Sequence, residues 1–183
     1  MQASRYERAI QRNLAELQRA ILNRTTLLGF EDAGGLGHLF LELAYYAFFN
    51  DYVGHCIKVF DRNTRSASFW YIYRANQKAI TSYARSHKIN IAILERVSDK
   101  LKKIRDKTHF HIDRDGVFDP AAIWRDADLS GKELSAAVDA AWDILKQLET
   151  SLGLPEVTLL DYDCQVARRV AIAVGKGRMD GDP

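Results

Sequence analysis

Residues 94–113 read LERVSDKLKKIRDKTHFHID, and this stretch decides the fold class. Its apolar residues recur every three or four positions, at Leu94, Val97, Leu101 and Ile104. This spacing places them on one face of an α-helix. The same step continues through Thr108 to His111, so we expect the helix to end near His111 or Ile112 with a basic, histidine-rich last turn.

Helical spacing also extends over most of the remaining chain. Helices are predicted over residues 6–28, 38–60, 69–85, from about 91 to 111, from an N-cap at Ser130 to 152, and over a short stretch at 166–174. The helix over 38–60 is apolar nearly all the way round, which predicts a central position. Turn-forming residues predict breaks at 32–37, 61–64 and 113–120.

These elements predict an all-α fold. We expect an up-and-down helical bundle of four main helices plus an additional C-terminal helix. Residues 1–153 are expected to form a single helical domain, and residues 154–183 a C-terminal extension that is disordered from 175 onwards.

Composition places the chain among ordinary globular proteins. It has 183 residues, of which 47% are hydrophobic and 27% charged, with a formal net charge of only +2. Any nucleic-acid-binding surface must therefore be local. Cys56 and Cys164 lack a metal-binding spacing. Residues 1–8 are polar and charged, so export by a signal peptide is not expected. The longest apolar run, 39–49, is too short to span a bilayer. A cytoplasmic protein without a membrane segment is expected.

The chemistry-bearing residues concentrate at the end of the helix that finishes near His111. Arg105 lies one position beside the apolar stripe, and four lysines flank it. Cleavage of RNA without a metal needs an acid, a base and a cation that stabilises the charge developing on the phosphate. Histidine and arginine can supply these groups. By itself, His111 would more simply be a hydrogen-bonded histidine on a packed face.

The order of Arg105, Asp106, four further residues and His111 resembles the motif of the HEPN superfamily (higher eukaryote and prokaryote nucleotide-binding domains). With Asp113 two residues past the histidine, the wording looks most like the abortive-infection branch. The resemblance implies a helical bundle and a homodimer in which two motifs face one cleft. It also implies an endoribonuclease that needs no metal or cofactor and serves phage defence or a toxin–antitoxin system, with RNA as substrate and an antitoxin protein as a possible partner. His111 would act as general acid or base, Arg105 as phosphate clamp and Asp106 as its orienting residue.

Substrate contacts are predicted at Lys103, Lys107 and His109. His109 follows Arg105 by four residues and shares its helix face more closely than His111 does, so either histidine could be the key one. The lysines could equally be an ordinary solvated helix face. A metal cluster of His109, His111 and the two following aspartates is disfavoured, because residues two apart on a helix point away from each other.

Two other functions stay open. A HEPN-like module could bind nucleotide, RNA or protein without catalysis, and a monomer would favour this reading. A helical DNA-binding regulator ranks last, because no basic recognition helix is evident in the sequence.

Overall fold

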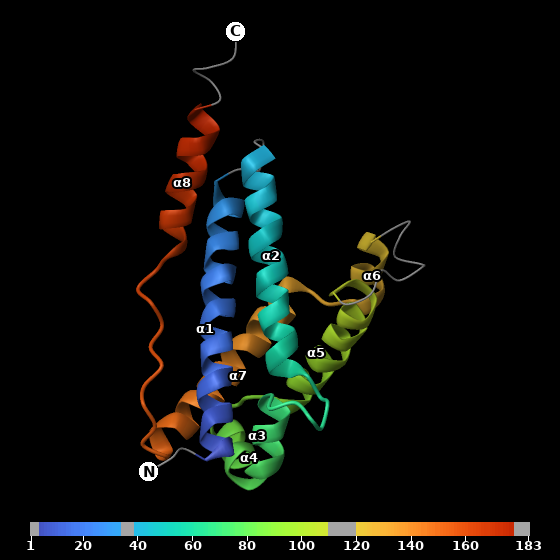
Figure 1. The fold of residues 1–183 in the computed structure, drawn as a ribbon, viewed down its shortest axis with the longest axis vertical. Coiled ribbons are helices and arrows are strands. Elements are labelled where there is room, and N and C mark those ends of the chain that lie inside the picture. The colour runs from blue at the N-terminus through green and yellow to red at the C-terminus, as the bar shows by residue number, and fades with distance from the viewer. Residues whose placement is uncertain (1–3, 34–38, 110–119, 178–183) are drawn as a thin grey trace. The chain divides into compact units, whose positions relative to one another are not determined.

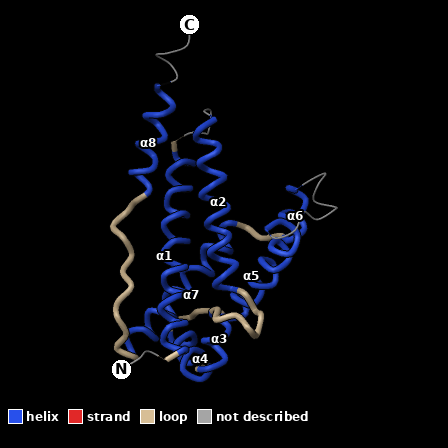
Figure 2. Tube along the Cα trace, in the orientation of Figure 1, coloured by secondary structure: helices blue, strands red, loops and turns tan. Residues whose placement is uncertain are grey.

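The computed structural model describes residues 4–33, 39–109 and 120–177. Within these residues the chain forms eight α-helices and one π-helical turn, and no strand (Figures 1 and 2). The helices are α1 (Arg5–Asp32), α2 (Leu39–Phe60), α3 (Phe69–Ala75), α4 (Gln77–Ser86), α5 (Ile91–Ile104), the π-helix η1 (Arg105–His109), α6 (Pro120–Ala127), α7 (Gly131–Ser151) and α8 (Cys164–Gly177). The prediction of an all-α helical fold is confirmed.

By packing, the chain divides into two compact units. Unit 1 comprises residues 1–17 and 56–157, and unit 2 comprises residues 18–55 and 158–183. Helices α1 and α2 are each divided between the two units. The start of α1 and the end of α2 belong to unit 1, and the remainder of both helices belongs to unit 2. The expected domain over 1–153 with a separate extension stays a prediction.

Unit 1 is built around α5. The stripe read from the sequence is buried, with Leu94, Val97 and Ile104 at 0% exposure, and α5 contacts both α6 and α7. The indole of Trp70 donates to Ser98 Oγ at 2.8 Å, which satisfies the one polar group that α5 buries at this contact. Ser130 caps α7 as predicted, because its Oγ accepts from the Glu133 backbone N–H at 3.1 Å.

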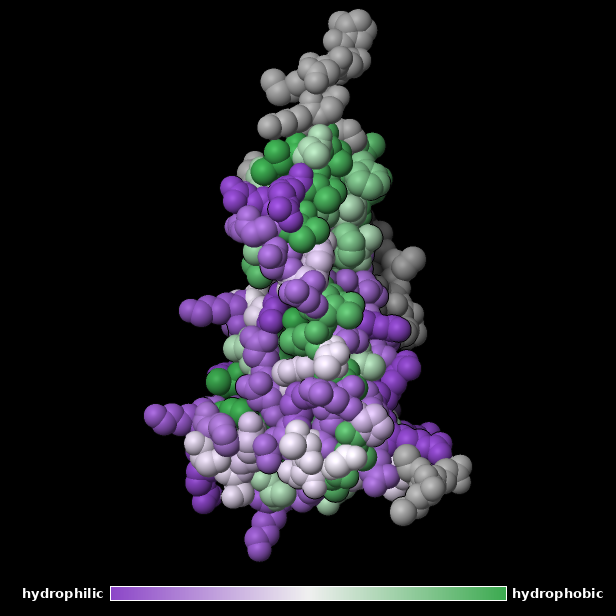
Figure 3. Space-filling view, turned by 90° about the vertical axis from the view of Figure 1, so that its left-hand side faces the viewer, coloured by the Kyte–Doolittle hydropathy of each residue, from purple (hydrophilic) through white to green (hydrophobic). Residues whose placement is uncertain are grey.

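Unit 2 packs α8 against α1 and the first half of α2. Phe30, Leu41, Ala167 and Ala171 form its buried cluster. Gly29 allows the close approach of α8, since a Cβ at this position would overlap the Cys164 carbonyl and lie 2.7 Å from Ala167 Cβ. Exposed apolar side chains of unit 2 include Leu160 and Val170. Figure 3 shows apolar surface on the side from which α8 is seen.

Several element predictions need correction. The helix predicted over 69–85 is two helices, because Asn76 adopts a non-helical backbone with φ −140° and ψ 43°. Helix α6 was not predicted. It begins at Pro120, and proline is favoured at the first position of a helix because a backbone N–H there would have no acceptor within the helix. Helix α8 continues to Gly177, past the expected start of disorder at 175. The predicted turn at 32–37 and loop at 113–120 lie largely outside the described residues.

The central position predicted for residues 38–60 is correct only for the second half of α2. There, Val53, Cys56 and Val59 are 0% exposed. In the first half, Leu39, Leu43 and Tyr46 are 69%, 61% and 61% exposed. Apolar composition predicted burial all round, whereas the cluster of unit 2 covers only the face that carries Leu41.

Candidate functional site

Arg105 begins the π-helical turn that follows α5. Helix α5 is capped by Asn90, whose Oδ1 accepts from the Ala92 N–H at 3.0 Å, and it ends at Ile104, which is fully buried. The wider turn of η1 starts at the next residue. Single π-helical turns are often found at functional sites. The buried stripe thus anchors the helix end while the Arg105 side chain stays 24% exposed.

Two carboxylates hold the Arg105 guanidinium. Its Nε donates to Asp106 Oδ1 at 2.8 Å, and its Nη1 donates to Asp61 Oδ1 at 3.0 Å. The hydrogen bond to Asp106, with the negative charges of both aspartates, raises the pKa of Arg105 above its ordinary value. The guanidinium is therefore always charged and fixed in orientation.

Arg105 lines a hollow of about 510 Å³ at the junction of α2, the following loop and η1. The lining residues are Ile57, Lys58, Asp61, Asn63, Ser66, Arg105 and Asp106. Two cations, two carboxylates, an amide and a hydroxyl thus share one hollow. Such a set can bind a phosphate through the cations and orient its neighbours by hydrogen bonds.

The loop over 61–68 is shaped by its own side chains. Asp61 Oδ1 accepts from the Asn63 N–H at 3.1 Å, and Asn63 Oδ1 accepts from the Arg65 N–H at 3.0 Å. These local bonds are typical of Asx turns. Asp61 therefore reaches Arg105 from a braced backbone.

The predicted site residues fall into three groups. The side chains of Arg105 and Asp106 contact each other, and their catalytic roles stay a prediction. Lys103 lines a different hollow, with Asp99 and Asp126, and Lys107 is exposed. The His109 backbone belongs to η1, but its side chain and all of His111 lie outside the described residues. The choice between the two histidines stays a prediction.

Sequence reasoning missed the half of the hollow that comes from α2 and its loop. Lys58 is the last cation of α2, and Asp61 and Asn63 were interpreted only as helix-breaking residues. Nothing in the local pattern links them to Arg105, because the two segments are 44 residues apart.

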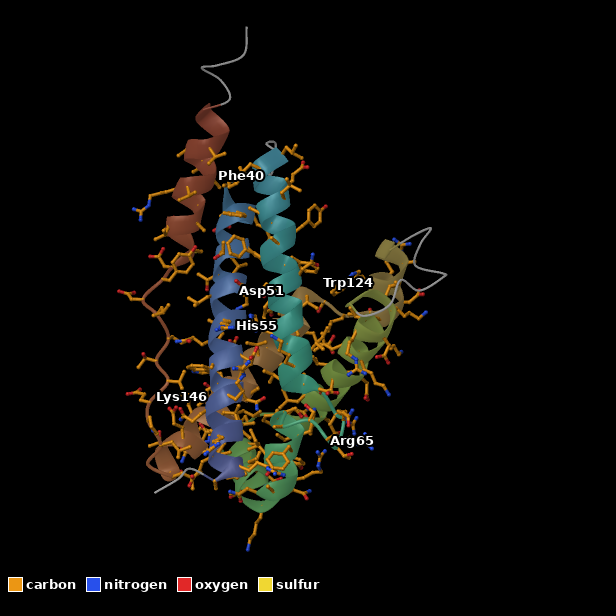
Figure 4. The ribbon with its side chains drawn as sticks, viewed as in Figure 1. Phe40, Asp51, His55, Arg65, Trp124 and Lys146 are labelled. Atoms are coloured by element: carbon orange, nitrogen blue, oxygen red, sulfur yellow. The ribbon has the colours of Figure 1, made fainter. Side chains whose placement is uncertain are left out.

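Other polar groups fit a phosphate site less well. His55 is 3% exposed, and its Nε2 lies 3.2 Å from Asp51 Oδ2 on the same helix (Figure 4). A further hollow of about 390 Å³, lined by residues of α4 and α7, has no charged side chain among its described lining residues.

Within the described residues, no group of three or more His, Cys, Asp or Glu side chains could hold a metal ion. Across the same ranges, every helix is too short or too polar to cross a membrane.

No protein-family model, no curated protein and no solved structure matches this chain. The resemblance to the HEPN superfamily accordingly rests on the motif at Arg105, Asp106 and His111.

Proposed function

We propose that this protein is a metal-independent endoribonuclease of the HEPN type. The observation that carries the proposal is the fixed Arg105 guanidinium in a hollow that also contains Lys58. A phosphate in this hollow would meet two cations from different elements, which is what a developing phosphorane charge needs. Asp106 would orient the guanidinium, because its Oδ1 lies 2.8 Å from Arg105 Nε and 2.7 Å from Arg105 Nη2.

In the proposed reaction the ribose 2′-oxygen attacks the adjacent phosphorus. The 2′-hydroxyl proton passes to a base, the bond from phosphorus to the 5′-oxygen breaks, and the 5′-oxygen takes up a proton. The products are a 2′,3′-cyclic phosphate and a 5′-hydroxyl end. His111 is the proposed acid or base, and a second copy of the chain would supply the other one in a shared cleft. Phage defence or a toxin–antitoxin system is the proposed setting, with an antitoxin protein as possible partner.

One observation favours the non-catalytic binding module as the second candidate. Asp61 and Asp106 balance the charges of Arg105 and Lys58, so a phosphate entering the hollow also meets two carboxylates. Binding without turnover at this site would fit that balance.

The test is cleavage of a labelled structured RNA in EDTA, with identification of the product ends. We expect Arg105→Ala and His111→Ala each to lower the rate by about 10²- to 10⁴-fold, the usual contribution of such groups. Arg96→Ala is the matched control, because Arg96 is an exposed α5 arginine paired with Glu133 outside this hollow. Full activity in either site variant would refute the assignment, and binding without cleavage by the wild type would establish the second candidate.

A further inference from the structure

A second hollow of about 360 Å³ lies on the N-terminal part of α1. It is lined by Arg5, Arg8, Ala9, Arg12 and Ala67. The arginines are spaced by three and four residues, so they project from one face of the helix along about 10 Å of its axis. All three are exposed.

The α1 hollow has more uncompensated positive charge than the Arg105 hollow. No carboxylate is among its described lining residues, and Arg5 and Arg8 form no ion pair with any residue that the structure describes. Arg12 Nη2 contacts Glu16 Oε1 at 2.8 Å. The Arg105 hollow, by contrast, has two cations and two carboxylates. Attraction for a polyanion therefore comes from α1 more than from Arg105 itself.

Helix stability does not explain these arginines. Cations in the first turns of a helix oppose its dipole. The start of α1 is stabilised by a reciprocal cap, in which Ser4 N–H donates to Glu7 Oε2 at 2.7 Å and Glu7 N–H donates to Ser4 Oγ at 3.2 Å. The side chains of Arg5 and Arg8 form no hydrogen bond in that cap, so their placement fits a ligand better than a helix start.

The two hollows adjoin each other. Glu16, which is 4% exposed, contacts Arg12 of the α1 hollow and also Lys58 Nζ of the Arg105 hollow, the latter at 3.2 Å. In the loop between α2 and α3, Ser66 lines the Arg105 hollow and the next residue, Ala67, lines the α1 hollow.

This loop is fixed to α1, because Asn13 Nδ2 donates to the Ala67 carbonyl at 2.7 Å. The loop also carries the exposed Arg65 (Figure 4). A ligand long enough to cross this one loop could therefore occupy both hollows.

We propose that Arg5 and Arg8 hold the sugar–phosphate backbone of a single RNA strand whose neighbouring phosphate lies at Arg105. The inference deepens the proposed function and rests on it. The substrate is then an oligonucleotide that spans both hollows, whereas a mononucleotide could occupy only one of them. One guanidinium group can donate two parallel hydrogen bonds to a phosphate and makes no contact with the bases. This contact is therefore independent of the RNA sequence.

The test measures binding apart from cleavage. The probe is a fluorescein-labelled 20-nucleotide 2′-O-methyl RNA, which lacks the attacking hydroxyl, titrated at several salt concentrations. We expect Arg5→Ala/Arg8→Ala to raise Kd roughly tenfold or more and to reduce the salt slope by about 1.4, because each lost phosphate contact accounts for about 0.7.

The matched control is Lys78→Ala/Arg85→Ala, which removes two cations from a different hollow on α4. Its Kd should stay within about twofold of the wild type. Equal weakening by both double variants, or no weakening by either, would overturn the proposal. So would arginine-dependent binding to phosphatidylcholine vesicles containing a quarter phosphatidylserine without binding to the RNA, which would indicate a lipid surface instead.

Cleavage assays separate this inference from the proposed function. With a cleavable 20-nucleotide RNA, Arg5→Ala/Arg8→Ala should raise KM far more than with a dinucleotide. An equal effect on both substrates would refute the extended strand while leaving the nuclease in place. Arginine-dependent binding without any cleavage by the wild type would refute the nuclease while leaving the α1 contact in place.

Discussion

Asp61 controls how Arg105 can act. One carboxylate oxygen, Oδ1, accepts from both Arg105 Nη1 at 3.0 Å and the Asn63 N–H at 3.1 Å. The aspartate thus orients the guanidinium but also competes with any incoming phosphate for it. A ligand at this site must replace part of that interaction, so its affinity depends on contacts elsewhere, such as those on α1.

Tyr45 is the residue whose titration the structure predicts most directly. Its hydroxyl donates to Glu31 Oε1 at 2.9 Å, and burial, with that hydrogen bond and the charge of Glu31, raises its pKa to about 12. We therefore expect one of the eight tyrosines to ionise near pH 12 in an ultraviolet titration, and Tyr45→Phe to remove that step.

The linked effect on stability has a definite sign. Because the folded state raises the pKa of Tyr45 from 10.0 to about 12, stability linked to its proton is present below pH 10 and is lost as pH rises towards 12. The free energy of unfolding should fall less steeply over this range in Tyr45→Phe. Glu31→Gln should lower the pKa of Tyr45, since it removes the carboxylate charge. A late ionisation that persists unchanged in Tyr45→Phe would contradict the assignment.

At the scale of elements, the contact between α1 and α8 depends on a missing side chain. Gly29→Ala would place a Cβ against the Cys164 carbonyl and within 2.7 Å of Ala167 Cβ, so α8 must shift. We expect a loss of about 1 to 3 kcal/mol in the free energy of unfolding, typical of overpacking, and faster hydrogen exchange in α8. Urea denaturation and amide exchange would measure both.

Gly54→Ala is the matched control on α2. A Cβ there meets no atom within 4 Å, so the substitution should stabilise the helix by roughly 0.5 to 1 kcal/mol. Equal effects of the two substitutions would show that the approach of α8 to Gly29 is not a tight contact.

The elements show what periodicity can and cannot predict. The stripe of α5 and the Ser130 cap of α7 were predictable, because each depends on residues within a few positions of each other. The break at Asn76 was not, since Asn76 makes no side-chain cap bond and stands between two helical patterns. Helix α6 is eight residues long, too short for its spacing to stand out.

The candidate site divides in the same way. Arg105 and Asp106 are adjacent, so the sequence could pair them. Asp61 and Lys58 reach the same hollow from α2 and its loop, and the contact of Asp61 with Arg105 is tertiary, so no local pattern in the sequence could reveal it. The arginines of α1 were not predicted as part of a site, because spacing on one helix does not reveal which loop lies beside it.

At the scale of the whole chain, unit 1 joins segments from near both ends of the sequence. Glu149 on α7 is 2% exposed. Its Oε1 accepts hydrogen bonds from Gln11 Nε2 of α1 at 3.2 Å and from the Val157 N–H at 2.9 Å. Its Oε2 accepts a hydrogen bond from Lys146 Nζ. Gln11 Nε2 also donates to the Pro155 carbonyl at 2.8 Å. One buried carboxylate thus connects α1, α7 and the segment that leaves α7.

Removing this carboxylate should destabilise the chain more than any exposed charge does. Glu149→Ala leaves the Val157 N–H without its acceptor and the Lys146 ammonium without its closest partner, so we expect a fall of roughly 2 to 4 kcal/mol in the free energy of unfolding. Glu156→Ala is the control, because Glu156 is 71% exposed and meets the same lysine at 3.5 Å; its effect should stay within about 0.5 kcal/mol. Urea denaturation followed by tryptophan fluorescence would decide, and equal losses would mean that Glu149 does not connect these segments in solution.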